Sequence, residues 1–149
     1  MELKRIHYNN WVAKKFLFND YTTIMLFGNI LTKGKYVTQD TERHESTHVY
    51  QYFECLILGL FIIAPLTIWH SIWWVFLVPF FYYILYLGEW FISFLYRLLF
   101  KNNGDAGEVN HKSYKAGALE MEAEYYESHV TEFYGKRKYF GWFKYYGKI

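Results

Sequence analysis

A stretch of 33 residues, Leu56 to Gly88, contains no Asp, Glu, Lys or Arg. An uncharged run of this length argues against an ordinary soluble domain and is typical of a membrane segment. It divides at Trp69-His70-Ser71 into two parts of 14 and 17 residues, and the apolar character resumes after Glu89. The sequence therefore predicts a two-helix transmembrane hairpin over residues 55–100.

The charged residues around this run predict its orientation. All 16 Lys and Arg lie outside the interval from His44 to Tyr96, seven before it and nine after it. By the positive-inside rule, both flanks are expected in the cytoplasm and the chain at the cytoplasmic (inner) membrane as an integral protein. The alternative is a soluble or monotopic protein whose apolar helices cover a site or dimerise, because the first segment is short for a full crossing.

Just before the apolar run stands the pentapeptide His44-Glu45-Ser46-Thr47-His48. Positions four apart share one face of a helix, so both imidazoles can bind one zinc ion while Glu45 addresses a metal-bound water. Thr38-Gln39-Asp40-Thr41 supplies N-capping side chains, which predicts a helix over residues 40–54. The competing interpretation is a surface helix whose two histidines only happen to lie one turn apart.

A third protein ligand is expected from the acidic segment Leu119 to Glu127. Glu120, Glu124 and Glu127 share one helical face, which makes Glu120 the candidate ligand and Glu124 a candidate hydrogen-bond partner of a ligand histidine. The alternative is a solvated acidic face. His111, Tyr114 and His129 flank this helix, predicted over 112–134, and could stabilise a transition state, although each taken singly fits a packed or solvated role better.

These blocks resemble the gluzincin metallopeptidases. HExxH is followed by Glu120-Met121-Glu122-Ala123-Glu124, an E-x-x-A-[D/E] helix, as in membrane-embedded members such as the CAAX prenyl protease type. Together with Thr23–Ile30 and HESTHVYQ, the pattern is similar to small bacterial gluzincin-like proteins. The resemblance implies zinc bound by His44, His48 and Glu120, Glu45 as the general base, and a zincin-like fold. Glu124 stands where Asp is more usual.

Before the motif, residues 21–32 are rich in Thr, Ile, Met, Leu and Phe and are interpreted as a strand within a strand region over 21–37. Gly28 is expected to mark a kink or bulge, with a possible hairpin partner at Lys35-Tyr36-Val37. In zincins such a strand pairs with an extended substrate. A strand that only covers the helix is an equal alternative.

The chain is thus expected to be one mainly α-helical membrane domain of 149 residues, ending in a basic, aromatic tail over 135–149. With a net charge of only +2, this tail suits membrane lipid better than nucleic acid. The predicted function is an integral-membrane zinc metallopeptidase acting on a peptide or membrane-protein substrate. The alternative is a non-catalytic membrane protein that keeps a structural zinc site for partner binding.

Overall fold

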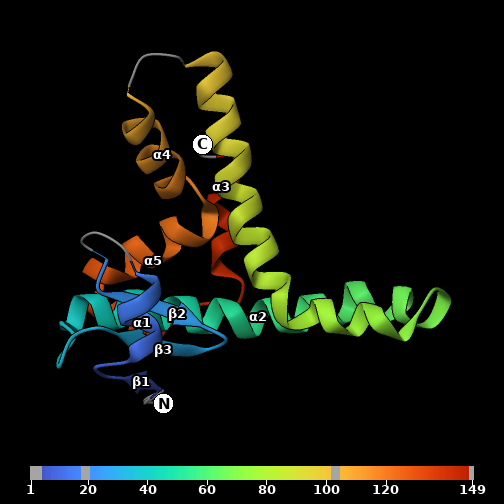
Figure 1. Cartoon of the computed structure of the whole chain (residues 1–149), viewed down its shortest axis with the longest axis horizontal. Helices are drawn as coiled ribbons and strands as arrows, with labels where there is room; N and C mark the ends of the chain where they lie inside the picture. The colour runs from blue at the N-terminus through green and yellow to red at the C-terminus, as the bar shows by residue number, and fades with distance from the viewer. Residues whose placement is uncertain (1–4, 18–20, 102–104, 148–149) are drawn as a thin grey trace. The chain divides into compact units, whose positions relative to one another are not determined.

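The computed structural model describes residues 5–17, 21–101 and 105–147, and the chain divides into two compact units. The first unit comprises Met1–Glu54 and Ala123–Arg137, and the second comprises Cys55–Glu122 and Lys138–Ile149. Helices α2 (Gln39–Trp69) and α5 (Ala118–Ser128) each continue from one unit into the other. The protein is mainly helical with one small sheet (Figure 1), as the sequence predicted.

The sheet belongs to the first unit and has the strand order β1-β3-β2. Strand β1 (Ile6–His7) pairs in parallel with β3 (Asn29–Thr32), and β2 (Thr23–Leu26) pairs antiparallel with β3. Short helix α1 (Trp11–Phe16) connects β1 to this hairpin and begins where the Asn10 side chain accepts from the Val12 amide at 2.9 Å. The central strand β3 supplies most of the buried residues of the sheet.

The single strand expected over 21–32 is wrong, because the chain reverses in its middle. Phe27 and Gly28 both have positive φ, 48° and 73°, which is the geometry of a two-residue type I′ hairpin turn. Gly28 is therefore a turn residue and not a bulge, and β2 pairs with β3 and not with residues 35–37. A Cβ on Gly28 would lie 3.2 Å from the Phe53 ring, so the turn packs closely against α2.

The first unit also contains the start of α2, the end of α5, and α6 (Val130–Lys136). Arg137, just after α6, forms a two-pronged ion pair with Glu54 on α2, at 2.7 and 3.3 Å. The two side chains are only 7% and 4% exposed. The Arg137 guanidinium also lies 5.1 Å from the centre of the Tyr50 ring. This buried pair fastens the end of α6 to α2.

Arg137→Ala is expected to lower the free energy of unfolding by about 3–5 kcal/mol, because it removes the counter-charge of a buried carboxylate. Denaturant unfolding in detergent, followed by tryptophan fluorescence, measures the change. Lys136→Ala is the matched control, since Lys136 is the exposed neighbouring cation and its loss should change the stability by less than about 0.5 kcal/mol. Equal stability of the two variants would contradict the role given to this pair.

The second unit begins with residues 55–69 of α2, which lead into η1 (Ile72–Phe80) and then α3 (Phe81–Phe100). Gly59 allows a close approach here, because a Cβ at this position would lie 3.1 Å from the Phe81 Cβ. Helix α4 (Ala106–Lys115) packs along α3 (Figure 1), and η2 (Gly141–Tyr145) adds the buried Trp142. Of the predicted tail, residues 148–149 lie outside the described part of the chain.

The one helix expected over 112–134 is wrong in its boundaries, because three helices occupy this region: α4, α5 and α6. The break between α4 and α5 falls at Ala116 and Gly117, where a Cβ on Gly117 would lie 3.1 Å from a Glu89 oxygen. The break between α5 and α6 falls at His129, whose backbone leaves the helical region with φ −107° and ψ 71°. Glu120 and Glu124 nevertheless share one helix, α5.

Two helical segments, Gln39–Trp69 and Ile72–Phe100, are long and apolar enough to cross a membrane. Only 28% and 11% of their most apolar stretches are buried within the protein. Most of their apolar surface is therefore exposed. This exposure indicates association with a membrane, because a soluble protein rarely leaves so much contiguous apolar surface in water.

Candidate metal centre

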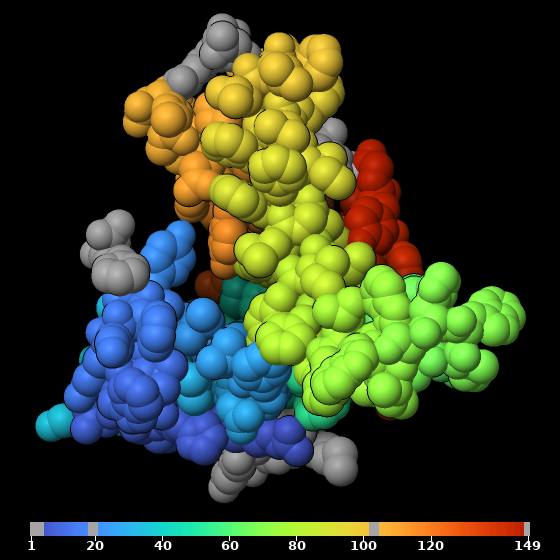
Figure 2. Space-filling view, turned by 45° about the vertical axis from the view of Figure 1, so that its right-hand side comes forward, coloured from blue at the N-terminus to red at the C-terminus, as the bar shows by residue number. Residues whose placement is uncertain are grey.

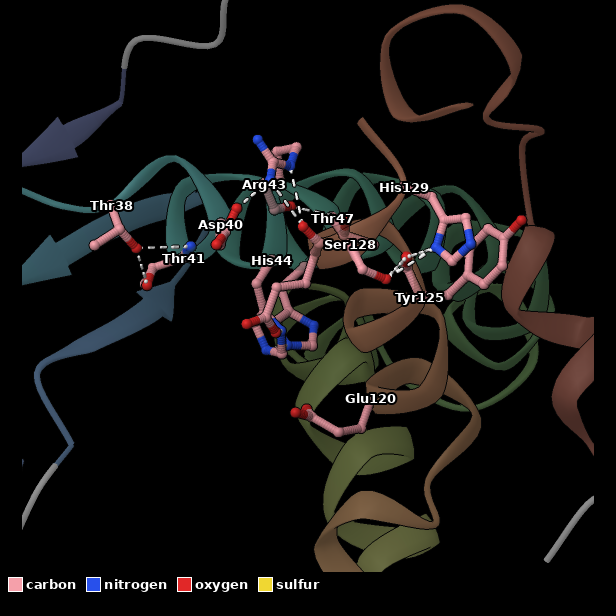
Figure 3. A network of polar contacts seen from close by, with 12 residues as sticks. Thr38, Asp40, Thr41, Arg43, His44, Thr47, Glu120, Tyr125, Ser128 and His129 are labelled. Carbon is pink, nitrogen blue, oxygen red and sulfur yellow. Dashed lines mark hydrogen bonds and ion pairs between the residues drawn. The ribbon is translucent and has the colours of Figure 1, made fainter. Parts of the chain in front are cut away.

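Helix α2 begins as the sequence predicted. The Thr38 hydroxyl accepts from the Thr41 amide at 3.2 Å and lies 2.8 Å from the Thr41 hydroxyl, which caps the first turn (Figure 3). The cap sets the helix before the motif, so that His44 and His48 are one turn apart on one face. Their rings lie edge to face with centres 4.9 Å apart, and their Nε2 atoms are 3.2 Å apart.

The outer nitrogens of both histidines contact hydrogen-bond acceptors. His44 Nδ1 lies 3.2 Å from Glu127 Oε2, and His48 Nδ1 lies 2.8 Å from Gln51 Oε1. A carboxylate or amide oxygen accepts, so Nδ1 is the donor in both contacts, and in the neutral form of each ring Nε2 then presents a lone pair. Two lone pairs 3.2 Å apart repel one another, and a bound cation removes that repulsion. The chemistry of this donor set therefore fits a metal ion.

Arg43 holds Glu127 in place within the same unit. Its Nε and Nη2 donate to the Glu127 main-chain oxygen at 3.2 and 2.8 Å, and its guanidinium also pairs with Asp40 (Figure 3). Arg43 is buried, with 5% of its surface exposed. Because the arginine sits one residue before His44, it fixes the end of α5 against the turn that carries the first histidine. Glu127 can then reach His44 Nδ1.

Glu120 is held by helix α3 of its own unit. The Tyr86 hydroxyl donates to Glu120 Oε2 at 2.8 Å, and only 3% of Glu120 is exposed. One turn further along α3, Glu89 accepts from the Leu119 amide at 3.3 Å, in the first turn of α5. Helix α3 thus supports both the start of α5 and the carboxylate that α5 carries.

Tyr146 supports Glu89 in turn, because its hydroxyl donates to the Glu89 carboxylate. Burial, and then the hydrogen bond and charge of Glu89, hold the pKa of Tyr146 well above its usual range. The hydroxyl therefore stays protonated at every physiological pH and remains a donor. The Glu89 carboxylate thus joins the aromatic tail to the start of α5.

His44, His48 and Glu120 together form a group that could hold a metal ion. Each offers one ligand atom, and these atoms all lie within 4.8 Å of one another. His48 and Glu120 are buried and His44 is half-buried. Two imidazole nitrogens and one carboxylate oxygen are the protein ligands of an open zinc site, in which a fourth position is left for water or substrate. The general base proposed beside them, Glu45, is also buried, at 8% exposure.

The remaining predicted residues have other surroundings. His129 stacks on Tyr125 with ring centres 4.1 Å apart, and its Nδ1 lies 2.9 Å from the Ser128 hydroxyl and 2.7 Å from the Tyr125 carbonyl oxygen (Figure 3). Tyr114 packs edge-on against Tyr86, and His111 is exposed on α4. Glu124 is half-buried on α5. A transition-state role for the first three, and an orienting role for Glu124, stay predictions.

Sequence reasoning missed four contributors to this centre: Gln51, Glu127, Arg43 and Tyr86. Gln51 had a local signal, since it lies three residues after His48 in the same helix. Glu127 had a weaker one, as the last member of the acidic face of α5. The bond between Tyr86 and Glu120 had none, because 34 residues separate them.

Comparison of the chain with models of known protein families, with curated proteins and with solved structures finds no match. The function is therefore inferred from the chemistry of the site.

Proposed function

We propose that this protein is a membrane-bound zinc metallopeptidase of the gluzincin type, with His44, His48 and Glu120 as the zinc ligands. The observation that carries the proposal is the pair of imidazoles whose outer nitrogens contact acceptors and whose inner nitrogens face one another at 3.2 Å. The carboxylate of Glu120 supplies the third ligand of the type that such sites use.

A zinc ion bound there supplies Lewis acidity, polarising a scissile carbonyl and making a water molecule more acidic. Glu45 is adjacent to His44 on the helix and carries the one motif carboxylate that is not a ligand. It takes a proton from the attacking water as the water oxygen bonds to the carbonyl carbon. The same carboxyl then gives the proton to the amine nitrogen as the carbon–nitrogen bond breaks.

The substrate class that suits this site is a peptide or the exposed tail of a membrane protein, since the exposed apolar helices keep the enzyme at a bilayer. Lys and Arg are confined to the two flanks of the apolar segment, which favours the cytoplasmic side of the inner membrane for both flanks and for the site.

The first test is the metal content. Protein purified in detergent is expected to carry about one zinc per chain, as an open three-ligand site implies, measured by elemental mass spectrometry against protein concentration. Preparations that stay free of metal after zinc addition and desalting would overturn the site.

Comparison of membrane proteomes from cells expressing wild type and Glu45→Gln then searches for the substrate, as a cleaved product seen only with wild type.

Tyr86→Phe is expected to weaken zinc binding by about 10–100-fold, the usual cost of losing a partner that orients a metal ligand. The substitution keeps the ring and removes only the hydroxyl that donates to Glu120. A competition titration against a zinc-binding dye measures the affinity. Tyr83→Phe is the matched control from the same helix and should leave the affinity unchanged. Equal affinities of the two variants would exclude the orienting role of Tyr86.

A further inference from the structure

Helix α3 is amphipathic once its tyrosines are counted as polar. One face carries exposed apolar side chains, namely those of Ile84, Leu87, Phe91, Leu95 and Leu98. The opposite face is buried or half-buried and carries hydroxyls and charges, namely those of Tyr82, Tyr86, Glu89, Ser93 and Arg97. Two faces of this kind are characteristic of a helix that lies in a membrane interface and not of one that crosses the hydrocarbon.

Helix α4 occupies the polar side of α3. Trp90 Nε1 donates to Asn110 Oδ1 at 2.9 Å, and Tyr114 packs on Tyr86, so the two helices run antiparallel along much of their lengths. On α4, Glu108 and Lys112 form an exposed ion pair at 2.6 Å, and both side chains are more than half exposed. Exposed charges are costly in hydrocarbon. Helices α3 and α4 therefore cannot cross a bilayer together.

The part of α2 that lies in the second unit, residues 55–69, is too short to cross a bilayer by itself. Residues 55–69 of α2 form a helix about 22 Å long at 1.5 Å per residue, whereas the hydrocarbon core is about 30 Å thick. The helix cannot recruit its preceding turns, because Glu54 is buried in its ion pair with Arg137. The segment returns through η1, and the tip carries Trp69 and Trp73, exposed by 80% and 72%.

The end of α2 and η1 form a hairpin over residues 55–80, and this hairpin and α3 present apolar side chains on one face of the molecule. In Figure 1, α3 turns away from the axis of the hairpin instead of running beside it, and α4 lies on the side of α3 away from the hairpin. Figure 2 shows bulky side chains of the hairpin (green) and of α3 (yellow-green) on the same face. At the far end of α3, the Lys101 ammonium lies 5.7 Å from the centre of the Tyr96 ring, a basic and aromatic pair suited to lipid headgroups.

We propose that the protein binds a single leaflet of the bilayer. The hairpin of residues 55–80 enters as a wedge whose tip reaches about the midplane, since half of a bilayer with its headgroups measures about 20–22 Å. Helix α3 lies along the interface, with Leu87 and Leu95 among the acyl chains and its polar face against α4. This arrangement replaces the two crossings predicted from composition, and it keeps both flanks on one side of the membrane. It does not depend on the zinc site.

The test is a depth measurement. In a Cys55→Ala background, which removes the one buried thiol, nitroxide labels are placed by His70→Cys, Leu87→Cys and Leu95→Cys. The proteins are reconstituted in vesicles of phosphatidylcholine and phosphatidylglycerol, and the accessibility of each label to oxygen and to a nickel chelate gives its depth. Tyr36→Cys is the aqueous reference, because Tyr36 is 81% exposed on the first unit.

The leaflet arrangement predicts that the label at His70 is the deepest, near the midplane, and that the labels at Leu87 and Leu95 are shallow and at equal depth. Two crossings predict the reverse order: His70 in water on the far side, Leu87 near the midplane, and Leu95 about 12 Å from it along the helix axis. That result would overturn the proposal. So would aqueous accessibility at all three sites, which would identify the apolar surface as a contact with protein.

Each label replaces an exposed side chain, so the fold is expected to persist. Circular dichroism of the labelled proteins checks that it does, and because zinc does not enter the measurement, failure of the metal site would leave its outcome unaffected.

Discussion

Glu45→Gln is expected to bind zinc as wild type does and to lower hydrolysis by about 100-fold or more, the usual share of general acid–base catalysis. The amide has the size of the carboxylate but cannot take the proton of the attacking water. His44 and His48 keep their partners Glu127 and Gln51, so the ligands stay oriented. The measurements are the zinc content of the purified variant and its rate of cleavage of the product identified in the proteome comparison.

Glu42→Gln is the control for this variant. Glu42 lies three residues earlier on α2 and is exposed, so the substitution removes the same charge from the same helix without touching the site. It should cleave at the wild-type rate. If Glu45→Gln also cleaves at the wild-type rate, Glu45 is not the base. If no cleaved product distinguishes wild type from Glu45→Gln although both carry zinc, the metal has a structural role and the enzyme proposal fails.

His48→Ala is expected to lose the metal. Its affinity for zinc should fall by at least about 100-fold, because losing a ligand costs more than losing a residue that only orients one, which costs up to about 100-fold. The substitution removes one of two nitrogens that face each other at 3.2 Å and leaves His44 without its counterpart. A competition titration against a zinc-binding dye gives the affinity, and elemental mass spectrometry gives the bound metal.

His7→Ala is the control for this variant, because His7 is an exposed histidine on β1 whose ring contacts Asn29 at 3.4 Å. It should bind zinc with wild-type affinity, which would show that the loss in His48→Ala is specific to the pair on α2. Wild-type affinity in His48→Ala would mean that the metal is bound elsewhere in the chain and that the proposed ligand set is incorrect.

Much of the candidate site could be predicted from the sequence because it is built on one helix. A cap at Thr38 and a spacing of four residues are enough to put His44 and His48 on one face, and both are local properties of helical geometry. The grouping of Glu120 with the histidines was expected from the type of ligand that a zinc site needs. The fold was less accessible where the chain reverses on two residues, since Phe27-Gly28 lacks the usual Asn-Gly signal of such a turn.

The sequence by itself determined the metal-binding face of α2, the acidic face of α5 and the uncharged segment, because each depends on residues within a few turns of one another. Only the tertiary structure decided which partners orient the ligands and how the apolar segment is divided. The Tyr86 hydroxyl donates to Glu120, and the Glu89 carboxylate accepts from the Leu119 amide at the start of α5. Both contacts form because α3 packs beside α5. The same packing covers the tyrosine-rich face of α3 and leaves Leu87 and Leu95 exposed. A count of apolar residues cannot separate these two faces, because tyrosine is apolar over its ring and polar at its hydroxyl, and only the neighbours that pack against it determine which property is used.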